Sequence, residues 1–171
     1  MTSLLECSQE VLKDLFQHLF EQGAEKEEGA FLLVNPSETG KELRLRVIEL
    51  IKLYEANYVE QSDDYLELDE GTWSRVIKRA HSLRACIVEV HSHVGPWPAA
   101  FSLADLRGLR RTVPHVWWRL QNRPYLALVF TRKEFDALLW THSPHKPTLL
   151  NCISSGGEIL KPTSNSLSFW R

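Results

Sequence analysis

The spacing of apolar residues changes along the chain, and each spacing predicts a type of element. Residues 4–21 repeat apolar side chains at i, i+3, i+4, i+7 and i+8, which predicts an amphipathic helix with one face on a core. Residues 29–34 form an uninterrupted apolar run, as in a buried strand. Residues 35–40 are turn formers, and residues 43–47 alternate apolar and basic side chains, as in a strand with one face in water.

The second half of the chain shows the same two periods. After residues 52–68, which have no clear period, the chain is expected to form a helix and then a strand over residues 85–91. Two prolines and a glycine make residues 94–101 a loop, and the helix that begins at Ser102 is expected to end before Pro114. The remaining apolar runs predict short strands at residues 116–118, 125–130, 135–140 and 149–153.

The order of the elements predicts the fold class. They run helix, strands, helix, strand, helix, strands, with no internal repeat and no break in composition. We therefore expect one domain over residues 1–171, with a core in residues 10–153 and a C-terminal tail at 154–171, whose apolar end is expected to dock. The predicted class is α/β, with a mixed sheet and helices on its faces.

Charge and composition exclude several classes of protein. The chain has 20 Lys and Arg against 22 Asp and Glu, a net charge of −2, so neither nucleic acid nor a membrane surface is expected as a partner. No apolar run approaches the roughly 20 residues that span a bilayer, and the N-terminus lacks the pattern of a secretory signal. Three widely separated cysteines argue against a disulfide scaffold and favour a cytoplasmic location.

The most informative stretch runs from Glu89 to Asp105, EVHSHVGPWPAAFSLAD. His91 and His93 stand two residues apart at the end of a predicted strand, so both imidazoles point to the same face. Ser102 is placed to cap the next helix, and Asp105 lies in its first turn, where the helix dipole favours a carboxylate. Catalytic zinc takes three protein ligands and leaves a fourth position to water. His91, His93 and Asp105 are therefore the predicted ligands of one Zn²⁺.

Simpler interpretations exist for each part of this pattern. A single histidine at a strand end is usually structural, and Ser-x-x-Asp is a common way to begin a helix. Two other zinc patterns are not matched. Metallo-β-lactamase-like hydrolases follow His-x-His with Asp-His, where this chain has Val94 and Gly95, and nucleobase deaminases need His-x-Glu with Pro-Cys-x-x-Cys. The whole combination is much more restrictive than its parts and favours a metal site.

The combined pattern resembles the metal-binding motif of the JAB/MPN/Mov34 metalloprotease family (JAMM). That motif is His-x-His-Pro, six residues, then Ser-x-x-Asp, with a glutamate far upstream on a small-residue-rich strand. The upstream match is EEGAFLLV at residues 27–34, in which Glu27 is the better match and Glu28 the alternate general base; alone, both would be assigned to a solvated charge run. The chain departs from the motif at Val94, which replaces the proline, and in a loop of seven residues, 95–101.

The resemblance spans about residues 10–130 and implies a curved mixed sheet flanked by helices, with metallopeptidase activity. It implies that Zn²⁺ activates a water molecule and polarises the scissile carbonyl, with Glu27 as the general base. Ser102 would stabilise the developing oxyanion.

Relatives that keep all these groups are isopeptidases or peptidases, so the expected substrate is a ubiquitin-like protein or its conjugates, cut after the C-terminal glycine. The small single-domain form resembles bacterial JAB proteins encoded beside ubiquitin-like proteins in antiphage defence systems, so E1-like and E2-like proteins are the expected partners. Trp97 and Phe101 are the expected substrate contacts, with filling of the core as the alternative for either. Two other functions stay open: a catalytically silent scaffold of the same fold, and a zinc hydrolase of a small molecule or sulfur-carrier substrate.

Overall fold

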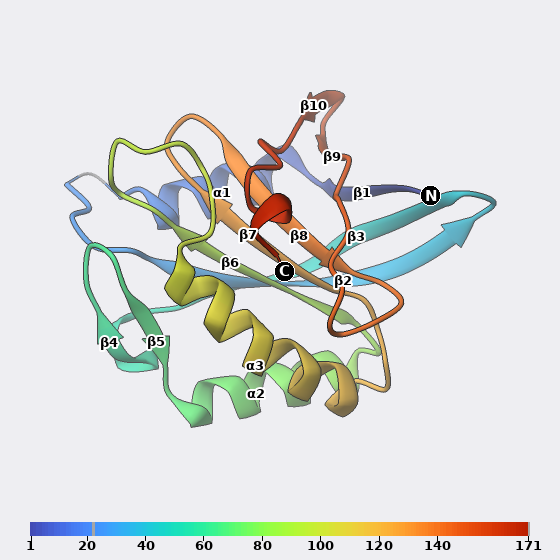
Figure 1. Cartoon of the computed structure of the whole chain (residues 1–171), viewed down its shortest axis with the longest axis horizontal. Helices are drawn as coiled ribbons and strands as arrows, with labels where there is room; N and C mark the ends of the chain where they lie inside the picture. The colour runs from blue at the N-terminus through green and yellow to red at the C-terminus, as the bar shows by residue number, and fades with distance from the viewer. Residues whose placement is uncertain (22, 171) are drawn as a thin grey trace.

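Eight strands form one mixed sheet in the computed structural model of the chain, which describes residues 1–21 and 23–170 (Figure 1). The order across the sheet is β10-β9-β1-β3-β2-β6-β7-β8, with β1–β3, β1–β9 and β6–β7 parallel and the other neighbours antiparallel. The strands are β1 (Thr2–Cys7), β2 (Gly29–Thr39), β3 (Glu42–Lys52), β6 (Cys86–Ser92), β7 (Tyr125–Phe130), β8 (Phe135–Trp140), β9 (Cys152–Ser155) and β10 (Glu158–Leu160). The sheet is curled, and the predicted α/β class with a curved mixed sheet is confirmed.

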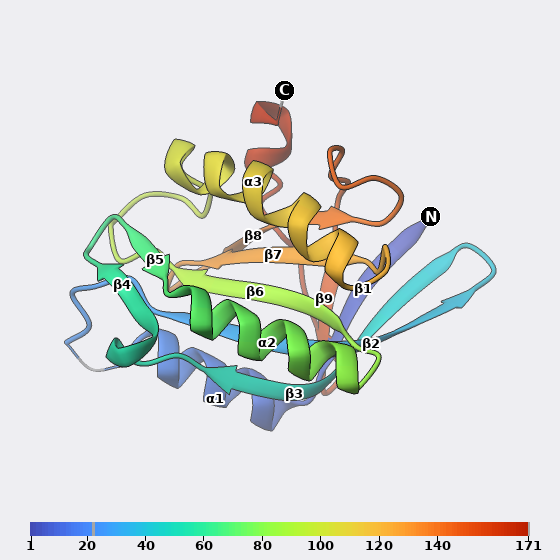
Figure 2. The same cartoon turned by 90° about the horizontal axis from the view of Figure 1, so that it is seen from below.

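Helices cover both faces of the sheet (Figure 2). Helix α1 (Gln9–Leu19) packs on one face, and α2 (Glu70–Ser82) and α3 (Leu103–Arg119) pack on the other. Because successive strand residues point to opposite faces, the central strands supply two separate cores. We call these sides the α1 face, with buried residues such as Leu15, Val88 and Leu128, and the α3 face, with buried residues such as Ile87, Val113 and Val129.

The N-terminus differs from the prediction. Residues 4–8, expected to begin the first helix, form part of strand β1 and the cap of α1. β1 lies between β3 and β9, where Leu5 pairs with Ile153, and this pairing across the sheet decides between helix and strand. The helix begins only after Ser8, whose hydroxyl accepts a hydrogen bond from Val11 N at 3.2 Å.

The predicted turn at residues 35–40 is also wrong in extent. β2 continues to Thr39 because its pairing with β3 satisfies the backbone hydrogen bonds of these polar residues. The chain reverses at Gly40, whose φ of 60° lies in the left-handed region that glycine tolerates.

Helix α3 does not end before Pro114 as predicted. It continues to Arg119, so residues 116–118 are helical and the strand expected there is absent. Val113 and Val116 on either side of the proline are fully buried on the α3 face. Burial of this helix face outweighs the loss of one backbone hydrogen bond at proline.

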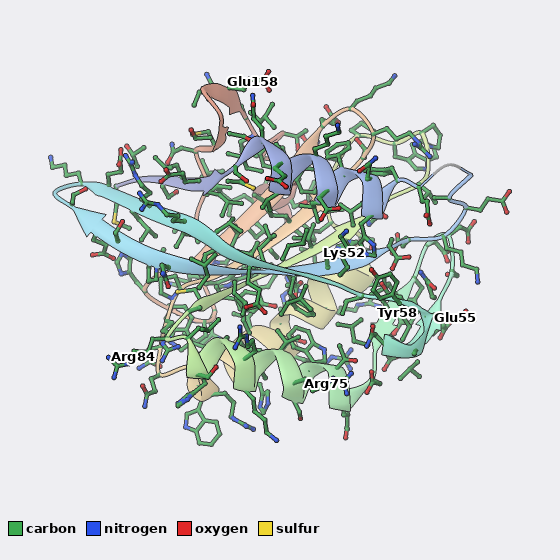
Figure 3. All side chains as sticks on the ribbon, turned by 180° about the vertical axis from the view of Figure 1, so that it is seen from behind. Lys52, Glu55, Tyr58, Arg75, Arg84 and Glu158 are labelled. Carbon is green, nitrogen blue, oxygen red and sulfur yellow. The ribbon has the colours of Figure 1, made fainter. Side chains whose placement is uncertain are left out.

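The segment without a clear period contains a separate two-stranded hairpin, formed by β4 (Tyr58–Gln61) and β5 (Leu66–Leu68) after the short 3₁₀ turn η1 (Glu55–Asn57). It projects at the end of the molecule where β2 begins, with Tyr58 and Glu55 close together at its base (Figure 3). Asp63 and Asp64 lie in the loop that joins its strands, as expected.

The C-terminal residues pack back onto the domain. The 3₁₀ turn η2 (Ser166–Phe169) follows β10, and the expected docking of the tail is confirmed by Trp170, whose ring lies 5.3 Å from that of Trp140. β1 and β10 belong to the sheet, so the sheet extends beyond the range 10–153 assigned to the core. None of the helices in the described ranges is long and apolar enough to cross a membrane.

Candidate metal centre

His91 and His93 lie at the end of a central strand. β6 pairs with β2 on one side and β7 on the other, which places His91 opposite Gly29 and Val129. The backbone pairing continues one residue beyond the strand, because His93 N donates a hydrogen bond to Phe130 O at 2.8 Å. Both imidazoles are therefore attached to a rigid part of the sheet.

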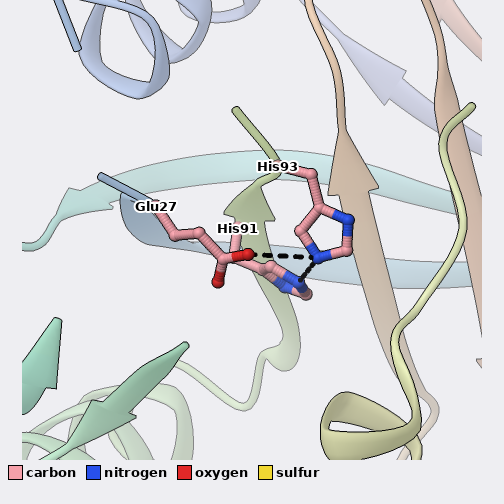
Figure 4. Close-up of side chains that lie close together, drawn as sticks. All are labelled: Glu27, His91 and His93. Carbon is pink, nitrogen blue, oxygen red and sulfur yellow. Dashed lines mark hydrogen bonds and ion pairs between the residues drawn. The ribbon is translucent and has the colours of Figure 1, made fainter. Parts of the chain in front are cut away.

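Four side-chain atoms converge beyond this strand end. His91 Nε2 and His93 Nε2 are 3.2 Å apart, and Asp105 Oδ2 lies 3.5 Å from the former and 3.3 Å from the latter. Glu27 Oε1 lies 3.4 Å from His93 Nε2. Figure 4 shows the Glu27 carboxylate directed at the two imidazoles from a different segment of the chain. The convergence brings together all the predicted metal ligands and the predicted general base.

These spacings fit ligand atoms around one ion. A tetrahedral site with metal–ligand distances of about 2.0–2.1 Å has neighbouring ligand atoms about 3.3–3.4 Å apart. The three distances that join His91, His93 and Asp105 are 3.2, 3.5 and 3.3 Å. Glu27, His91 and His93 also offer ligand atoms that all lie within 4.8 Å of one another, so this group can hold a metal ion. Asp105 approaches both imidazoles at ligand spacing, which favours it as the third ligand.

The first turn of α3 fixes the orientation of Asp105. Ser102 N donates to Asp105 Oδ2 at 2.7 Å, and Asp105 N donates to Ser102 Oγ at 3.1 Å, which forms a capping box. The helix-cap interpretation of Ser-x-x-Asp is therefore correct, and the same Oδ2 atom faces both histidines. Ser102 Oγ acts as an acceptor in the cap, so its own proton is available for another acceptor.

Hydrogen bonds to the backbone of Glu27 and of its neighbour Glu28 hold this segment from two sides. Glu27 N donates to Ser62 O at 2.8 Å, and Glu27 O accepts from Gln61 Nε2 at 2.8 Å, both on the hairpin side. On the sheet side, Ser92 lies between the two histidines, accepts from Glu28 N through Oγ at 2.9 Å, and donates from its N to Glu28 O at 2.9 Å. Glu27 is only 4% exposed and is thus positioned by both elements.

The alternate base, Glu28, has other partners. Its carboxylate accepts hydrogen bonds from the Tyr58 hydroxyl, from Gly29 N at 3.2 Å and from Gln61 Nε2 at 3.3 Å. His18 Nε2 lies 4.0 Å from it. The geometry therefore favours Glu27 over Glu28 as the group beside the histidines.

The electrostatics of the cluster favour a cation. Burial raises the pKa of Glu27 to about 7, with Asp105 adding to the rise and His91 opposing it. Burial acts to lower the pKa of His91, but Asp105 and Glu27 outweigh it and raise that pKa to about 9. Burial acts to raise the pKa of Asp105, yet His91 and His93 hold it well below its ordinary value. Two carboxylates around two imidazoles bind a proton firmly, and the same field stabilises a divalent cation.

The loop at residues 94–101 places its two aromatic residues differently. Phe101 is 6% exposed in the α3-face core, with its ring 5.8 Å from that of His91, which favours the alternative that it fills the core. Its N donates to Ser166 Oγ at 2.7 Å, which ties the loop to the C-terminal tail. Trp97 is 78% exposed, so its predicted role as a substrate contact stays open to test.

Two hollows meet at the cluster. The first, of about 640 Å³, is lined by Glu27, His93 and Trp97, together with Ser102 and the acidic hairpin loop. The second, of about 320 Å³, lies between α3 and β5 and is lined by His91 and Asp105. The cluster therefore borders both hollows, one through His91 and Asp105 and the other through Glu27 and His93.

Some residues that shape this region were not identified from the sequence. Gln61 falls in the segment without a period, so no pattern pointed to it. Glu89 did carry a signal, because it is a charged residue in an apolar strand on the same face as His91. Burial raises the pKa of Glu89 to about 7, while a hydrogen bond from the Tyr125 hydroxyl acts in the opposite direction.

Comparisons with known proteins add no assignment. No protein-family model matches the chain, and no curated protein matches it in sequence. The geometry of the four converging atoms and the resemblance of the motif are the evidence for a function.

Proposed function

We propose that the chain is a zinc-dependent peptidase or isopeptidase of the JAB/MPN type, which cleaves after the C-terminal glycine of a ubiquitin-like protein. The observation that supports it is the spacing of the Nε2 atoms of His91 and His93 and Oδ2 of Asp105, at 3.2–3.5 Å, with Glu27 Oε1 3.4 Å from His93. The class of substrate rests on the motif resemblance alone. Imidazole nitrogen and carboxylate oxygen are the donors that catalytic zinc sites use.

Each residue has a chemical task in this proposal. His91, His93 and Asp105 would hold Zn²⁺, which supplies a water of lowered pKa and polarises the scissile carbonyl. Glu27 takes a proton from the attacking water and delivers it to the leaving amine. The Ser102 hydroxyl donates a hydrogen bond to the carbonyl oxygen as negative charge develops there. The reaction consumes one water molecule, and the proton that Glu27 removes from it goes to the leaving amine, so no further reactant is needed.

The two hollows support a substrate that enters as an extended chain. The hollow between α3 and β5 can accept the acyl side of the scissile bond, and the hollow beside Trp97 can accept the amine side. Within residues 1–21 and 23–170, β5 pairs with β4 alone, so its other edge offers backbone groups to an added strand.

The proposal is tested by cleavage of ubiquitin-like protein fusions by the zinc-loaded chain. We expect cleavage after the terminal glycine, abolished by a chelator and restored by added zinc. Glu27→Gln should lower the rate by about 10²–10⁴-fold, the usual contribution of a general base, without loss of zinc. The neighbouring Glu28→Gln is the matched control. The Glu28 carboxylate accepts a hydrogen bond from the Tyr58 hydroxyl, so this variant should retain most of the activity.

Three outcomes would contradict the proposal. Cleavage that persists in the presence of a chelator, or in Glu27→Gln, would exclude the metal-dependent mechanism. Binding of a ubiquitin-like protein without turnover by the zinc-loaded chain would favour the scaffold alternative. Hydrolysis of small amides, with fusions left intact, would favour a small-molecule or sulfur-carrier substrate.

A further inference from the structure

The loop at residues 94–101 is tied to residues 163–166 of the tail, a segment that we call the clasp. Ala99 O accepts hydrogen bonds from Thr163 Oγ1 at 2.9 Å and from Asn165 Nδ2 at 3.0 Å. Ala99 is fully buried, and a buried backbone oxygen is unfavourable unless it is paired. The clasp therefore supplies the partners that this part of the loop requires.

Ser166 makes a second attachment, deeper in the protein. Its Oγ accepts a hydrogen bond from Phe101 N at 2.7 Å, and its own N donates to Asp136 Oδ2 at 2.8 Å. Asp136 lies on β8, is fully buried and also accepts from Ala137 N at 2.9 Å. A buried carboxylate is stable only when such donors satisfy it. Ser166 thus links the loop to a strand of the central sheet.

The clasp holds one residue in an unfavourable backbone conformation. Ser164 has a φ of 61°, in the left-handed region that is costly for a residue with a side chain. Its neighbours Thr163 and Asn165 both donate to Ala99 O. A conformation of this kind persists only where the surrounding contacts determine it, so the bonds to the loop stabilise the clasp in return.

The loop leads directly into the candidate metal centre. Phe101 precedes Ser102, whose N donates to Asp105 Oδ2 at 2.7 Å. The same Oδ2 atom lies 3.5 Å and 3.3 Å from the two imidazole nitrogens. A displacement of the Phe101 backbone would move Ser102 N and, with it, the oxygen that faces both histidines. The hydrogen bond from Phe101 N to Ser166 opposes that displacement.

We propose that Ser166 is a positioning residue of the metal centre. By holding Phe101 N, it fixes the start of α3, so that Asp105 Oδ2 stays at ligand spacing from both imidazoles. Groups that orient a metal ligand alter metal affinity when they are removed, although they do not touch the metal. The inference rests on the metal centre of the proposed function and is independent of the class of substrate.

Titration with Co²⁺ tests this role without requiring turnover. Co²⁺ can occupy a tetrahedral zinc site, and its visible absorption depends on the coordination geometry. Ser166→Ala removes the acceptor for Phe101 N but keeps the hydrogen bond from Ser166 N to Asp136. Thr163→Val, of nearly the same size, removes a different bond of the clasp, the one to Ala99 O.

Ser3→Ala is the matched control. Ser3 is 2% exposed on β1, and its hydroxyl donates to Leu149 O at 2.8 Å. β3 and β2 lie between β1 and β6, which carries the histidines. This variant therefore loses a comparable buried hydrogen bond in a part of the sheet that does not contact the metal centre.

We expect Ser166→Ala to bind Co²⁺ about tenfold more weakly than the wild type, with a changed visible spectrum at saturation. Thr163→Val should change both in the same direction by a smaller amount, because Asn165 still donates to Ala99 O. Ser3→Ala should lose as much free energy of unfolding as Ser166→Ala and keep the affinity and spectrum of the wild type. An unchanged affinity and spectrum in Ser166→Ala, or an equal change in Ser3→Ala, would overturn the inference.

Fusion cleavage, measured in parallel, separates this inference from the peptidase proposal. Metal-dependent cleavage by the wild type, together with identical Co²⁺ spectra of the wild type and Ser166→Ala, would overturn the inference and leave the peptidase proposal intact. A weaker and altered Co²⁺ site in Ser166→Ala, with no cleavage by the wild type, would support the positioning role and contradict the peptidase proposal. A wild type that binds no Co²⁺ would overturn both.

Discussion

The two faces of strand β6 differ sharply, although their residues alternate along one short segment. On the α1 face, three apolar side chains are buried at 3% exposure or less: Cys86, Val88 and Val90. On the α3 face, buried Ile87 is followed by Glu89, which lines a hollow, and then by His91 in the candidate metal centre. One face is closed core along its whole length, and the other changes from core to the candidate metal centre within five residues.

The difference shows how one sheet can serve both stability and chemistry. Close packing on the α1 face fixes the positions of the central strands. The α3 face then carries polar groups that would be unfavourable in a closed core but are held in place by the strand beneath them. Changes on the α1 face should therefore reduce stability, and changes at the end of the α3 face should alter metal binding and activity.

The largest effect should come from the ligand on the α3 side. Asp105→Asn keeps an oxygen that can accept from Ser102 N, so α3 should keep its cap, but the ligand charge is lost. We expect the zinc content, measured by elemental analysis, to fall from about one per chain to near zero. The affinity for zinc should fall by more than about 100-fold. Unchanged zinc content in this variant would show that Glu27, rather than Asp105, supplies the carboxylate ligand.

The opposite result is expected from a residue of the closed face. Leu128 is fully buried on the α1 face of β7, so Leu128→Ala leaves a cavity that the core cannot fill. The free energy of unfolding should fall by about 3 kcal/mol, measured by denaturant titration of the metal-free protein. Zinc content should stay at about one per chain; a loss of zinc from the folded variant would mean that the two faces are not independent.

A smaller effect is expected where cap and site meet. Ser102→Ala removes the acceptor for Asp105 N, which should lower the free energy of unfolding by about 1 kcal/mol. The same change removes the proposed donor to the carbonyl oxygen and should lower the rate about 10²–10³-fold. Ser102→Thr retains the hydroxyl, so it should recover most of the free energy of unfolding and most of the rate. Full activity in Ser102→Ala would exclude the donor role.

The smallest expected effect is a difference in reactivity among the three cysteine thiols. Burial raises the pKa of Cys7 to about 11 and that of Cys86 to about 12, from an ordinary value of 9.0. At pH 8 these thiols should resist alkylation in the folded protein, whereas Cys152, which is partly exposed, should react first. Mass spectrometry should find one modified thiol per native chain and three in denaturant. Because the unfolded chain releases these protons at lower pH, stability should fall as pH rises through about 9 to 11.

The limits of prediction from sequence are clearest where competing structures suit the same residues. Residues 4–8 fit a helix as well as a strand, and only pairing with β3 and β9 made them β1. Pro114 predicts a helix end by its local chemistry, yet the buried neighbours Val113 and Val116 keep α3 intact. In both cases the decisive interactions come from residues far away in the chain.

The α/β class, most central strands and the residue types at the candidate site can be predicted from the sequence, because hydrophobic period and His-x-His with Ser-x-x-Asp are local patterns. Packing between distant segments selects which glutamate faces the histidines. Glu27 and Glu28 are adjacent in the sequence, but Glu27 N donates to Ser62 O, whereas the Glu28 carboxylate accepts from the Tyr58 hydroxyl. The tertiary structure also placed Phe101 in the core and left Trp97 exposed. The physical reason is that burial and hydrogen-bond partners depend on packing between distant segments, which no local pattern contains.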